Sequence, residues 1–426
     1  MNYNETIQYL YDRLPVFHQI GAAAYKPGLD KSYQMMKRLG NPQSKYKTIH
    51  VAGTNGKGSV SHFLAAILQS AGYKTGLYTS PHLVDFGERI RVNGTKVNPE
   101  FVVRFVENNK RYFDEVEPSF FEATMAMAFD YYAAENVDVA VIEVGLGGRL
   151  DSTNIIQPEL SVITNISFDH TQFLGDSLEK IAIEKAGIIK KQTPVVVGES
   201  LAETKPVFIQ KAEAQNAPVF FAEELQPVRF LRYENGKMLV KTADFEVLEI
   251  GLNGMYQLKN VATVLESVVQ LQKLGFNLDE KNIRKGLSEV VVLTDLKGRW
   301  QTVSENPKIV LDSGHNKAGF EYIAEQLKHL EYNRLHIVFG MVNDKDITGV
   351  LALLPQDAEY YFTAANTLRA LSPDELKNRA KNFGLKGESY KSIAEAVRSA
   401  VARSERNDLI YVGGSNFVVG EALELF

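Results

Sequence analysis

The segment Gly53–Ser59 combines residue types that can hold a phosphate group. It reads Gly-Thr-Asn-Gly-Lys-Gly-Ser, follows a predicted strand and opens a predicted helix, as a phosphate-binding loop does. Glycines let successive backbone N–H groups point at one anion, and the helix N-terminus adds partial positive charge. Lys57 can reach terminal phosphates, and Ser59 can coordinate Mg²⁺. Its spacing departs from the common phosphate loop, because a third glycine separates Lys57 from Ser59.

Polar side chains also follow three other predicted strands. Ser80, Glu143 and His170 each lie at or just beyond the end of an apolar run. Ligands gather at the carboxyl ends of the strands in an open parallel sheet, and this set suits Mg²⁺ or Mn²⁺ better than zinc. Glu143 is costly on an apolar strand unless it is paired or bound to a metal. Taken alone, a histidine such as His170 is more often structural than a ligand, and Ser80 could equally be a cap or turn residue.

Lys185 lies in the amphipathic segment Glu179–Lys190. One turn before it stands Ile181, which carries no charge, and its sequence neighbour Glu184 does not face it on a helix. The helical pattern by itself therefore predicts a solvated lysine without a special partner.

The elements that must position these residues alternate between strand and helix. Short runs rich in Val and Ile are separated by longer amphipathic segments, which is typical of βαβ units and a mostly parallel sheet. The predicted strands are Thr48–Ala52, Thr75–Thr79, Val137–Val144 and Leu160–Thr164, and the predicted helices include Gly58–Ala71 and Ser177–Ile189.

Two Asn-Gly pairs between alternating segments predict hairpins, one in Arg89–Val97 and one in Phe230–Lys241. The second hairpin, together with Phe245–Ile250, indicates a small β excursion. A new βα series begins near Trp300, with strands expected at 308–312, 336–341, 359–363 and 408–413. We therefore predict a phosphate-loop-type, mostly parallel α/β domain over residues 1–298 and a smaller Rossmann-like α/β domain over 299–426.

The composition is that of an ordinary globular protein. Its 426 residues are 45% hydrophobic and 23% charged, with a formal net charge of −5. An acidic balance argues against a nucleic-acid-binding surface. The chain has no cysteine, which excludes disulfides, thiolate metal sites and cysteine nucleophiles. It shows no signal peptide and no stretch apolar enough for a membrane span, so we expect a cytoplasmic protein.

The chain resembles the folylpolyglutamate synthases and bifunctional dihydrofolate synthases of the Mur ligase superfamily. The resemblance rests on motifs that run in family order along nearly the whole chain. These motifs are Leu39–Pro42, Gly53–Ser59, Thr79–Leu83, Glu88–Val92, Glu143–Asn154, Asp169–Thr171, Leu174–Asp176, Glu184–Ile189, Gly298-Arg299, Asp312–Asn316 and Val419–Leu423.

The resemblance implies a role for each matching position. The ATP-binding residues would be Asn55, Gly56, Lys57, Gly58, Ser59, Asn260, Arg299, Asp312 and His315. The Mg²⁺ ligands would be Ser80, Glu143, His170 and Lys185, with Lys185 carbamylated by CO₂ into an anionic ligand. The pterin would contact Ser119, Phe120, Phe121, Glu122, Leu150, Asp151 and Ser152. Lys57, His170 and Lys185 would form the catalytic group.

The resemblance also implies an activity. It would be an ATP- and Mg²⁺-dependent ligase that adds L-glutamate to dihydropteroate and to tetrahydrofolates through an acyl phosphate. The second domain should close over the first and exclude water. We expect small-molecule substrates, no nucleic acid or membrane partner, and a monomer. The chain departs from the family pattern at Tyr256, Lys297, Ser313-Gly314 and Lys317.

Three other activities share parts of this pattern. A peptidoglycan-type Mur ligase has the same architecture and loop, but Leu39–Pro42 and Glu143–Asn154 favour the folate branch. A kinase would stop at phosphoryl transfer and would not need a second nucleotide-contacting domain. A nucleotide-gated binding module would not need Glu143, His170 and Lys185 together.

Overall fold

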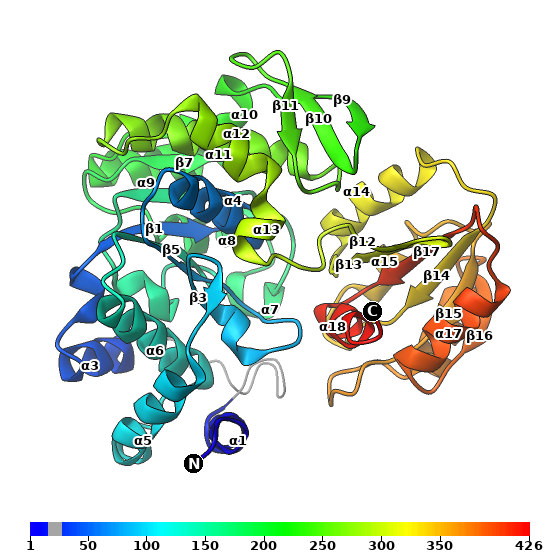
Figure 1. The fold of residues 1–426 in the computed structure, drawn as a ribbon, viewed down its shortest axis with the longest axis horizontal. Helices are drawn as coiled ribbons and strands as arrows, with labels where there is room; N and C mark the ends of the chain where they lie inside the picture. Colours follow the sequence, from blue (N-terminus) through cyan, green and yellow to red (C-terminus); the bar gives the residue numbers. More distant parts are fainter. Residues whose placement is uncertain (16–27) are drawn as a thin grey trace. The chain divides into compact units, whose positions relative to one another are not determined.

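The computed structural model describes residues 1–15 and 28–426 (Figure 1). The chain divides into two compact units, each with its own sheet and core. The first unit comprises Met1–Ser167, Thr171–Gly251 and Gln257–Leu296, and the second comprises Phe168–His170, Leu252–Tyr256 and Lys297–Phe426.

The first unit is built on an eight-stranded sheet in the order β4-β3-β2-β5-β1-β6-β7-β8. The strands from β2 to β8 in this order run parallel, whereas β3 and β4 form an antiparallel edge. The bounds are β1 (Lys47–Ala52), β2 (Thr75–Tyr78), β3 (Ile90–Val92), β4 (Thr95–Lys96), β5 (Val139–Glu143), β6 (Leu160–Ile163), β7 (Val195–Val197) and β8 (Val219–Phe221).

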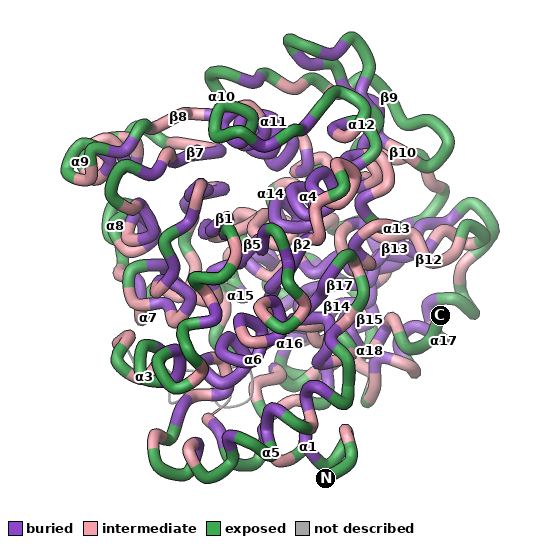
Figure 2. Tube along the Cα trace, turned by 60° about the vertical axis from the view of Figure 1, so that its left-hand side comes forward, coloured by how far each residue is buried: buried purple, intermediate pink, exposed green. Residues whose placement is uncertain are grey.

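Helices cover both faces of this sheet. Helix α4 is buried from Ser59 to Leu68, because it packs between the central strands and the helices α11 and α12. Ala140 and Ile142 of β5 join the apolar cluster that α5 and α6 bury on the other face. Figure 2 shows the central strands and α4 largely buried, whereas the outer loops are exposed.

The helices of the first unit are α1 (Tyr3–Arg13), α3 (Asp30–Arg38), α4 (Lys57–Ser70), α5 (Pro99–Val116), α6 (Phe120–Ala134), α7 (Thr171–Leu174), α8 (Leu178–Ala186), α9 (Lys205–Gln215), α10 (Ala222–Leu225), α11 (Gln257–Lys273), α12 (Glu280–Ser288) and α13 (Val290–Thr294). Short 3-10 turns are η2 (Pro42–Ser44), η3 (Phe86–Arg89) and η4 (Ser152–Ile155).

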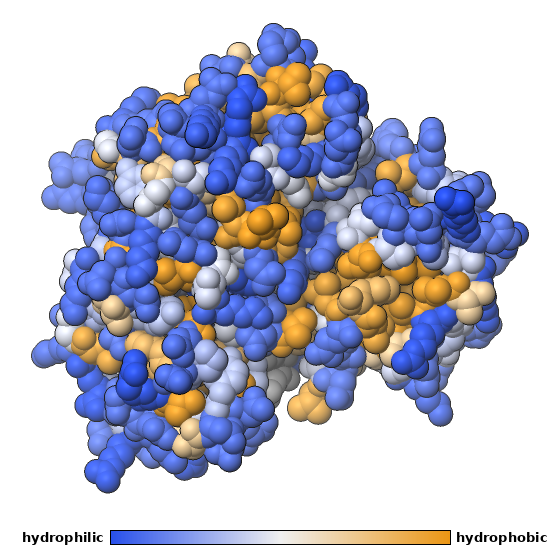
Figure 3. Space-filling view, viewed as in Figure 1, coloured by the Kyte–Doolittle hydropathy of each residue, from blue (hydrophilic) through white to orange (hydrophobic). Residues whose placement is uncertain are grey.

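The β excursion is a separate three-stranded antiparallel sheet in the order β11-β10-β9. Its strands are β9 (Arg229–Glu234), β10 (Lys237–Lys241) and β11 (Leu248–Ile250). Both predicted hairpins turn at Asn-Gly with positive φ at both residues, 48° and 77° at Asn93-Gly94 and 50° and 73° at Asn235-Gly236. Figure 3 shows apolar surface over this sheet, where Leu231, Tyr233 and Val247 are exposed.

The second unit holds a six-stranded sheet in the order β12-β13-β17-β14-β15-β16, parallel except for β12. Its strands are β12 (Gln301–Glu305), β13 (Lys308–Asp312), β14 (Leu335–Phe339), β15 (Glu359–Phe362), β16 (Lys386–Ser389) and β17 (Leu409–Gly413). Its helices are α14 (Lys317–Lys328), α15 (Ile347–Leu351), α16 (Pro373–Lys381), α17 (Ile393–Arg403) and α18 (Asn416–Leu423). No helix in the described part of the chain is both long and apolar enough to cross a membrane.

The eight-, three- and six-stranded sheets confirm the predicted fold class, which is a mostly parallel α/β unit with a β excursion, followed by a second α/β unit. The chain passes into the second sheet just after Leu296.

Candidate active site

The phosphate loop connects β1 to α4 and depends on Gly56. This glycine is the N-cap of α4, with φ 82°, and no side chain caps the helix there. A Cβ at Gly56 would lie 2.2 Å from Oδ1 of Asn260, so another residue would be strained at this positive φ and would displace the Asn260 side chain. The helix N-terminus therefore meets a loop of small residues, as an anion-binding site requires.

Lys57 bends back over the loop. Its Nζ donates hydrogen bonds to the carbonyl oxygens of Gly53 and Thr54, each at 3.0 Å. The ammonium group is thus held on the loop that would cradle a phosphate, which supports the predicted role of this lysine.

Two amide side chains that the sequence analysis did not assign hold the loop from outside. Gln257, at the start of α11, donates from Nε2 to the buried Ser59 hydroxyl at 3.1 Å and accepts from Nδ2 of Asn260 at 2.7 Å. Asn165, just after β6, accepts from the backbone N–H of Asn55 at 3.0 Å. Asn165 follows a strand end directly, and that position is the signal that could have identified it.

The interpretation of Lys185 as a solvated lysine is wrong. Its side chain is 4% exposed, and its Nζ donates to the carbonyl oxygen of Gly53 at 2.9 Å. Helix α8 is placed there by the loop after β5, because Arg149 N–H donates to the oxygen of Glu184 at 2.8 Å. A tertiary contact 132 residues away in sequence decides the environment of this lysine.

Glu143 and Ser80 lie together at adjacent strand ends. The carboxylate of Glu143 is buried, and its Oε2 accepts from the backbone N–H of Ser80 at 3.0 Å. Oxygen ligands of this kind fit Mg²⁺. No group of three or more His, Asp or Glu that could hold a metal occurs among the described residues.

His170 belongs by its contacts to the second unit, as part of Phe168–His170. Its backbone adopts a left-handed conformation, with φ 49°. Its neighbour Asp169 is 3.5 Å from Nε2 of His315 and 2.5 Å from Nζ of Lys345. Burial alone would raise the pKa of Asp169, but the His315 hydrogen bond and the Lys345 charge hold it well below its usual range. Lys345 was not identified from the sequence.

Asp312, at the end of β13, is a buried carboxylate with three donors. It accepts from the Tyr256 hydroxyl at 2.6 Å and from the backbone N–H groups of Trp300 and Gly314, each at 2.8 Å. Burial raises its pKa, and the Tyr256 hydrogen bond opposes that rise. Tyr256, a departure from the family pattern, thus orients a predicted ATP-contacting carboxylate.

The other predicted ATP contacts of the second unit flank Asp312. Arg299 donates from Nη1 to the Gly298 carbonyl at 3.2 Å and also contacts the Ser313 hydroxyl. Nδ1 of His315 lies 3.0 Å from the Ser313 carbonyl oxygen. Arg299, Asp312 and His315 therefore share one edge of the second sheet.

Ser119 and Glu122 form a capping box at the start of α6. Glu122 Oε2 accepts from the Ser119 N–H at 2.7 Å and from its hydroxyl at 2.9 Å, and Glu122 N–H donates to that hydroxyl at 3.2 Å. Phe120 is buried and stacks on Tyr11 at 5.2 Å. Phe121 is half-buried, and a Cβ at Gly145 would lie 2.5 Å from its ring, so the loop after β5 needs glycine there.

Asp151 caps η4 and is fully engaged by protein donors. It accepts from the backbone N–H groups of Thr153 at 3.0 Å and Leu146 at 2.8 Å, while Leu150 and Ser152 on either side are half-buried. Burial raises the pKa of Asp151, and the bond from the Thr153 hydroxyl opposes the rise. Asp151 therefore holds the shape of the loop that follows Glu143.

Comparison with known proteins places the chain in a family. Residues 51–268 match the "Mur ligase middle domain" and residues 298–416 match the "Mur ligase, glutamate ligase domain". The chain is 33% identical to a Bacillus subtilis protein named dihydrofolate synthase/folylpolyglutamate synthase, and the match covers 93% of this chain and 94% of that protein. The chain belongs to the dihydrofolate synthase/folylpolyglutamate synthase family of Mur ligases.

Solved structures of similar proteins agree with this membership. Escherichia coli FolC in complex with DHPP and ADP is 30% identical, with a TM-score of 0.84, over 100% of this chain and 97% of that one. A bifunctional folylpolyglutamate synthase/dihydrofolate synthase from Yersinia pestis, complexed with AMPPNP and Mn ion, is 28% identical, with a TM-score of 0.83, over 100% of this chain and 98% of that one. The resemblance inferred from the motifs is confirmed, and this family member is a ligase.

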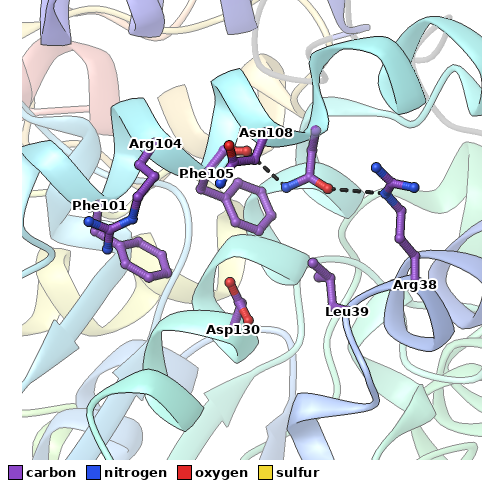
Figure 4. Close-up of a pocket in the computed structure, with 8 residues that line it drawn as sticks. Arg38, Leu39, Phe101, Arg104, Phe105, Asn108 and Asp130 are labelled. Atoms are coloured by element: carbon purple, nitrogen blue, oxygen red, sulfur yellow. Dashed lines mark hydrogen bonds between the residues drawn. The ribbon is translucent and has the colours of Figure 1, made fainter.

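A separate surface hollow of about 420 Å³ lies among α3, α5 and α6 (Figure 4). Arg38, Leu39, Phe101, Arg104, Phe105 and Asp130 are among its lining residues. Arg38 Nε donates to Asn109 Oδ1 at 3.3 Å, so that guanidinium is already engaged. None of the predicted site residues lines this hollow.

Proposed function

We propose that this chain is an ATP-dependent ligase that joins L-glutamate to dihydropteroate and to tetrahydrofolates through an amide bond. The observation that carries the proposal is family membership along nearly the whole chain, combined with a phosphate loop on which Lys57 and Lys185 converge. A carboxylate is a poor electrophile, so we infer that it is activated as an acyl phosphate before the amine of glutamate attacks.

The residues of the phosphate loop fit a nucleotide. ATP with Mg²⁺ would supply the phosphoryl group and offset its charge. Backbone N–H groups of the α4 N-terminus would orient the phosphates, and Lys57 would stabilise the charge that develops on the transferred group. Ser80, Glu143, His170 and a carbamylated Lys185 would hold the metal, and Asn260, Arg299, Asp312 and His315 would contact the nucleotide.

We assign the ATP-binding domain to residues 1–298 and the second Mur-ligase-type domain to residues 299–426. The pterin would contact Ser119–Glu122 and Leu150–Ser152. A monomer in the cytoplasm stays a prediction from the sequence.

A substrate panel tests the activity. Purified protein should release ADP and phosphate when ATP, a pterin carboxylate and L-glutamate are all present, and release should stop when either organic substrate is omitted. A kinase would release ADP without glutamate. Turnover with a UDP-muramoyl substrate in place of the pterin would instead indicate the peptidoglycan branch.

Isotope transfer tests the route. When the pterin carboxylate carries ¹⁸O, one labelled oxygen should appear in the released phosphate. Label in AMP with none in phosphate would mean that the carboxylate is adenylated, and the acyl phosphate would then be wrong.

A further inference from the structure

Arg89, the last residue of η3, is a buried cation without a carboxylate partner. Its side chain is 3% exposed, and it forms no ion pair with any described residue. Residues 16–27 contain no Asp or Glu that could supply one. A guanidinium stays protonated in a protein, and a buried charge is costly unless an opposite charge meets it.

Two contacts fix the plane of this guanidinium. Its Nε–H donates to Nδ1 of His82 at 2.7 Å, and its central carbon lies 5.3 Å from the centre of the Phe120 ring. Nε2 of the same ring lies 3.1 Å from the Tyr11 hydroxyl. Neither contact, a ring nitrogen or an aromatic face, supplies a negative charge to the guanidinium.

The terminal nitrogens of Arg89 are left for another partner. They make no hydrogen bond to any described residue. The fork of the guanidinium is therefore not used by the described part of the fold.

Arg91, two residues further along, shows how the fold treats a structural arginine. It is also 3% exposed, but it donates to the carbonyl of Glu88 and its NH2 lies 3.8 Å from the Asp295 carboxylate. Of these two buried arginines, only Arg91 has a carboxylate within 4 Å among the described residues.

We propose that Arg89 binds the carboxylate of the pterin substrate, the group that receives glutamate. The inference rests on the proposed function. A planar guanidinium matches a carboxylate with two parallel N–H···O bonds. Arg89 lies over Phe120, which is expected to contact the pterin. It is also near enough to Glu143, an expected metal ligand, for that carboxylate to raise its pKa, although burial lowers the pKa more strongly.

Equilibrium binding to the full-length protein tests this role. The probes are dihydropteroate and its analogue with hydrogen in place of the carboxylate. Wild type should bind dihydropteroate at least about tenfold more tightly than the analogue. Arg89→Met keeps the length of the side chain without its charge, and its preference should fall to about twofold or less. Arg89→Lys, which keeps a charge but not the fork, should lie between them.

Arg91→Met is the matched control, because it also removes a buried arginine. It should lower the melting temperature, since Asp295 loses its partner, and keep the preference for the carboxylate. A full wild-type preference in Arg89→Met, or in Arg89→Lys should the former not fold, overturns the proposal. The proposal is also overturned if Arg89→Met raises the KM for glutamate and leaves pterin binding unchanged. If wild type nevertheless consumes ATP only when pterin and glutamate are present, the proposed function stands and only the role of Arg89 is wrong. If wild type shows no such ATP consumption, both the proposed function and the role of Arg89 are wrong.

Discussion

Two lysine side chains converge on one carbonyl oxygen of the phosphate loop. The Nζ atoms of Lys57 and Lys185 donate to the oxygen of Gly53 at 3.0 and 2.9 Å, so they are within about 6 Å of each other, where two ammonium groups repel by about 3 kcal/mol at an effective dielectric constant of about 20. Carbamylation of Lys185 would turn that repulsion into attraction, and the carbamate would keep one N–H for the Gly53 carbonyl.

We therefore predict that Lys185 carries a carbamate. Protein equilibrated with ¹³C-bicarbonate should show a carbamate carbon signal that Lys185→Ala lacks. Lys185→Ala should be severely impaired, because the metal loses a ligand, and acetate should restore part of its activity. Lys57→Ala is the control that acetate should not rescue. A nucleotide- and metal-bound crystal with an unmodified Lys185 would count against the prediction.

Lys57 itself should be indispensable for turnover but not for the fold. Removing its ammonium group takes away charge stabilisation of the transferred phosphoryl group, so Lys57→Ala should nearly abolish kcat while circular dichroism stays unchanged. Lys237→Ala, in the exposed ion pair with Glu249, should behave like wild type. If Lys57→Ala retains kcat within about tenfold, or about 1.4 kcal/mol of barrier, its assignment is wrong.

At the scale of elements, the N-terminus of α4 should fail as an anion site when Gly56 gains a side chain. Gly56→Ala combines φ 82° with a Cβ 2.2 Å from Asn260 Oδ1, so the loop or the Asn260 side chain, an expected ATP contact, must move and MgADP affinity should fall at least about tenfold. Calorimetric titration measures this. Gly236→Ala has a similar φ of 73° with nothing within 4 Å of the new Cβ, so it should bind MgADP normally. Equal affinities in the two variants would mean that the loop does not cradle phosphate.

The capping box of α6 gives Glu122 two possible roles, which two substitutions separate. Glu122→Ala removes the acceptor of Ser119 and should lower stability by about 1 kcal/mol. Glu122→Gln retains an N3 acceptor and should unfold like wild type. If Glu122 also serves the pterin, both variants should lose more dihydropteroate activity than tetrahydrofolate activity. Equal loss in both reactions would leave Glu122 with the structural role alone.

The elements that could be predicted from sequence are those with strong local patterns. The buried strands β1, β5 and β6 and both Asn-Gly hairpins lie within about two residues of their expected bounds. The edge strands β12 (Gln301–Glu305) and β16 (Lys386–Ser389) were not expected, because they are polar and gain their pairing from neighbouring strands. The burial of Lys185 was missed for a related reason, since a helix pattern does not reveal a tertiary partner.

At the scale of the whole molecule, the two-unit α/β architecture followed from the alternation of elements and from motifs spread along the chain. The phosphate loop and the strand-end residues Ser80, Glu143 and His170 could be nominated from residue type and position, whereas the other site residues were nominated through the family motifs. Local chemistry did not reveal that Gln257, Asn165 and Tyr256 hold nominated residues in place, because each acts through a partner that is distant in sequence.

The molecule should also carry two activities at one centre. Dihydropteroate and a tetrahydrofolate both present a carboxylate for activation, but they differ in length by one glutamyl unit. A single activating site can serve both only if the pterin has two placements. The half-buried Phe121 offers a face for stacking, and the loop around Ser152 offers a second place nearby.

Two assays on one preparation test this bifunctionality. ATP consumption should depend on glutamate both with dihydropteroate and with tetrahydrofolate. Phe121→Ala removes the stacking face but leaves the buried Phe120 in the core, so it should change the ratio of the two activities rather than lower both equally. Phe120→Ala, the neighbouring control, loses its stack on Tyr11 and should destabilise the fold by about 3–5 kcal/mol. Activity with tetrahydrofolate alone would make the protein a dedicated polyglutamate synthase, and activity with dihydropteroate alone a dedicated dihydrofolate synthase; either result contradicts the prediction.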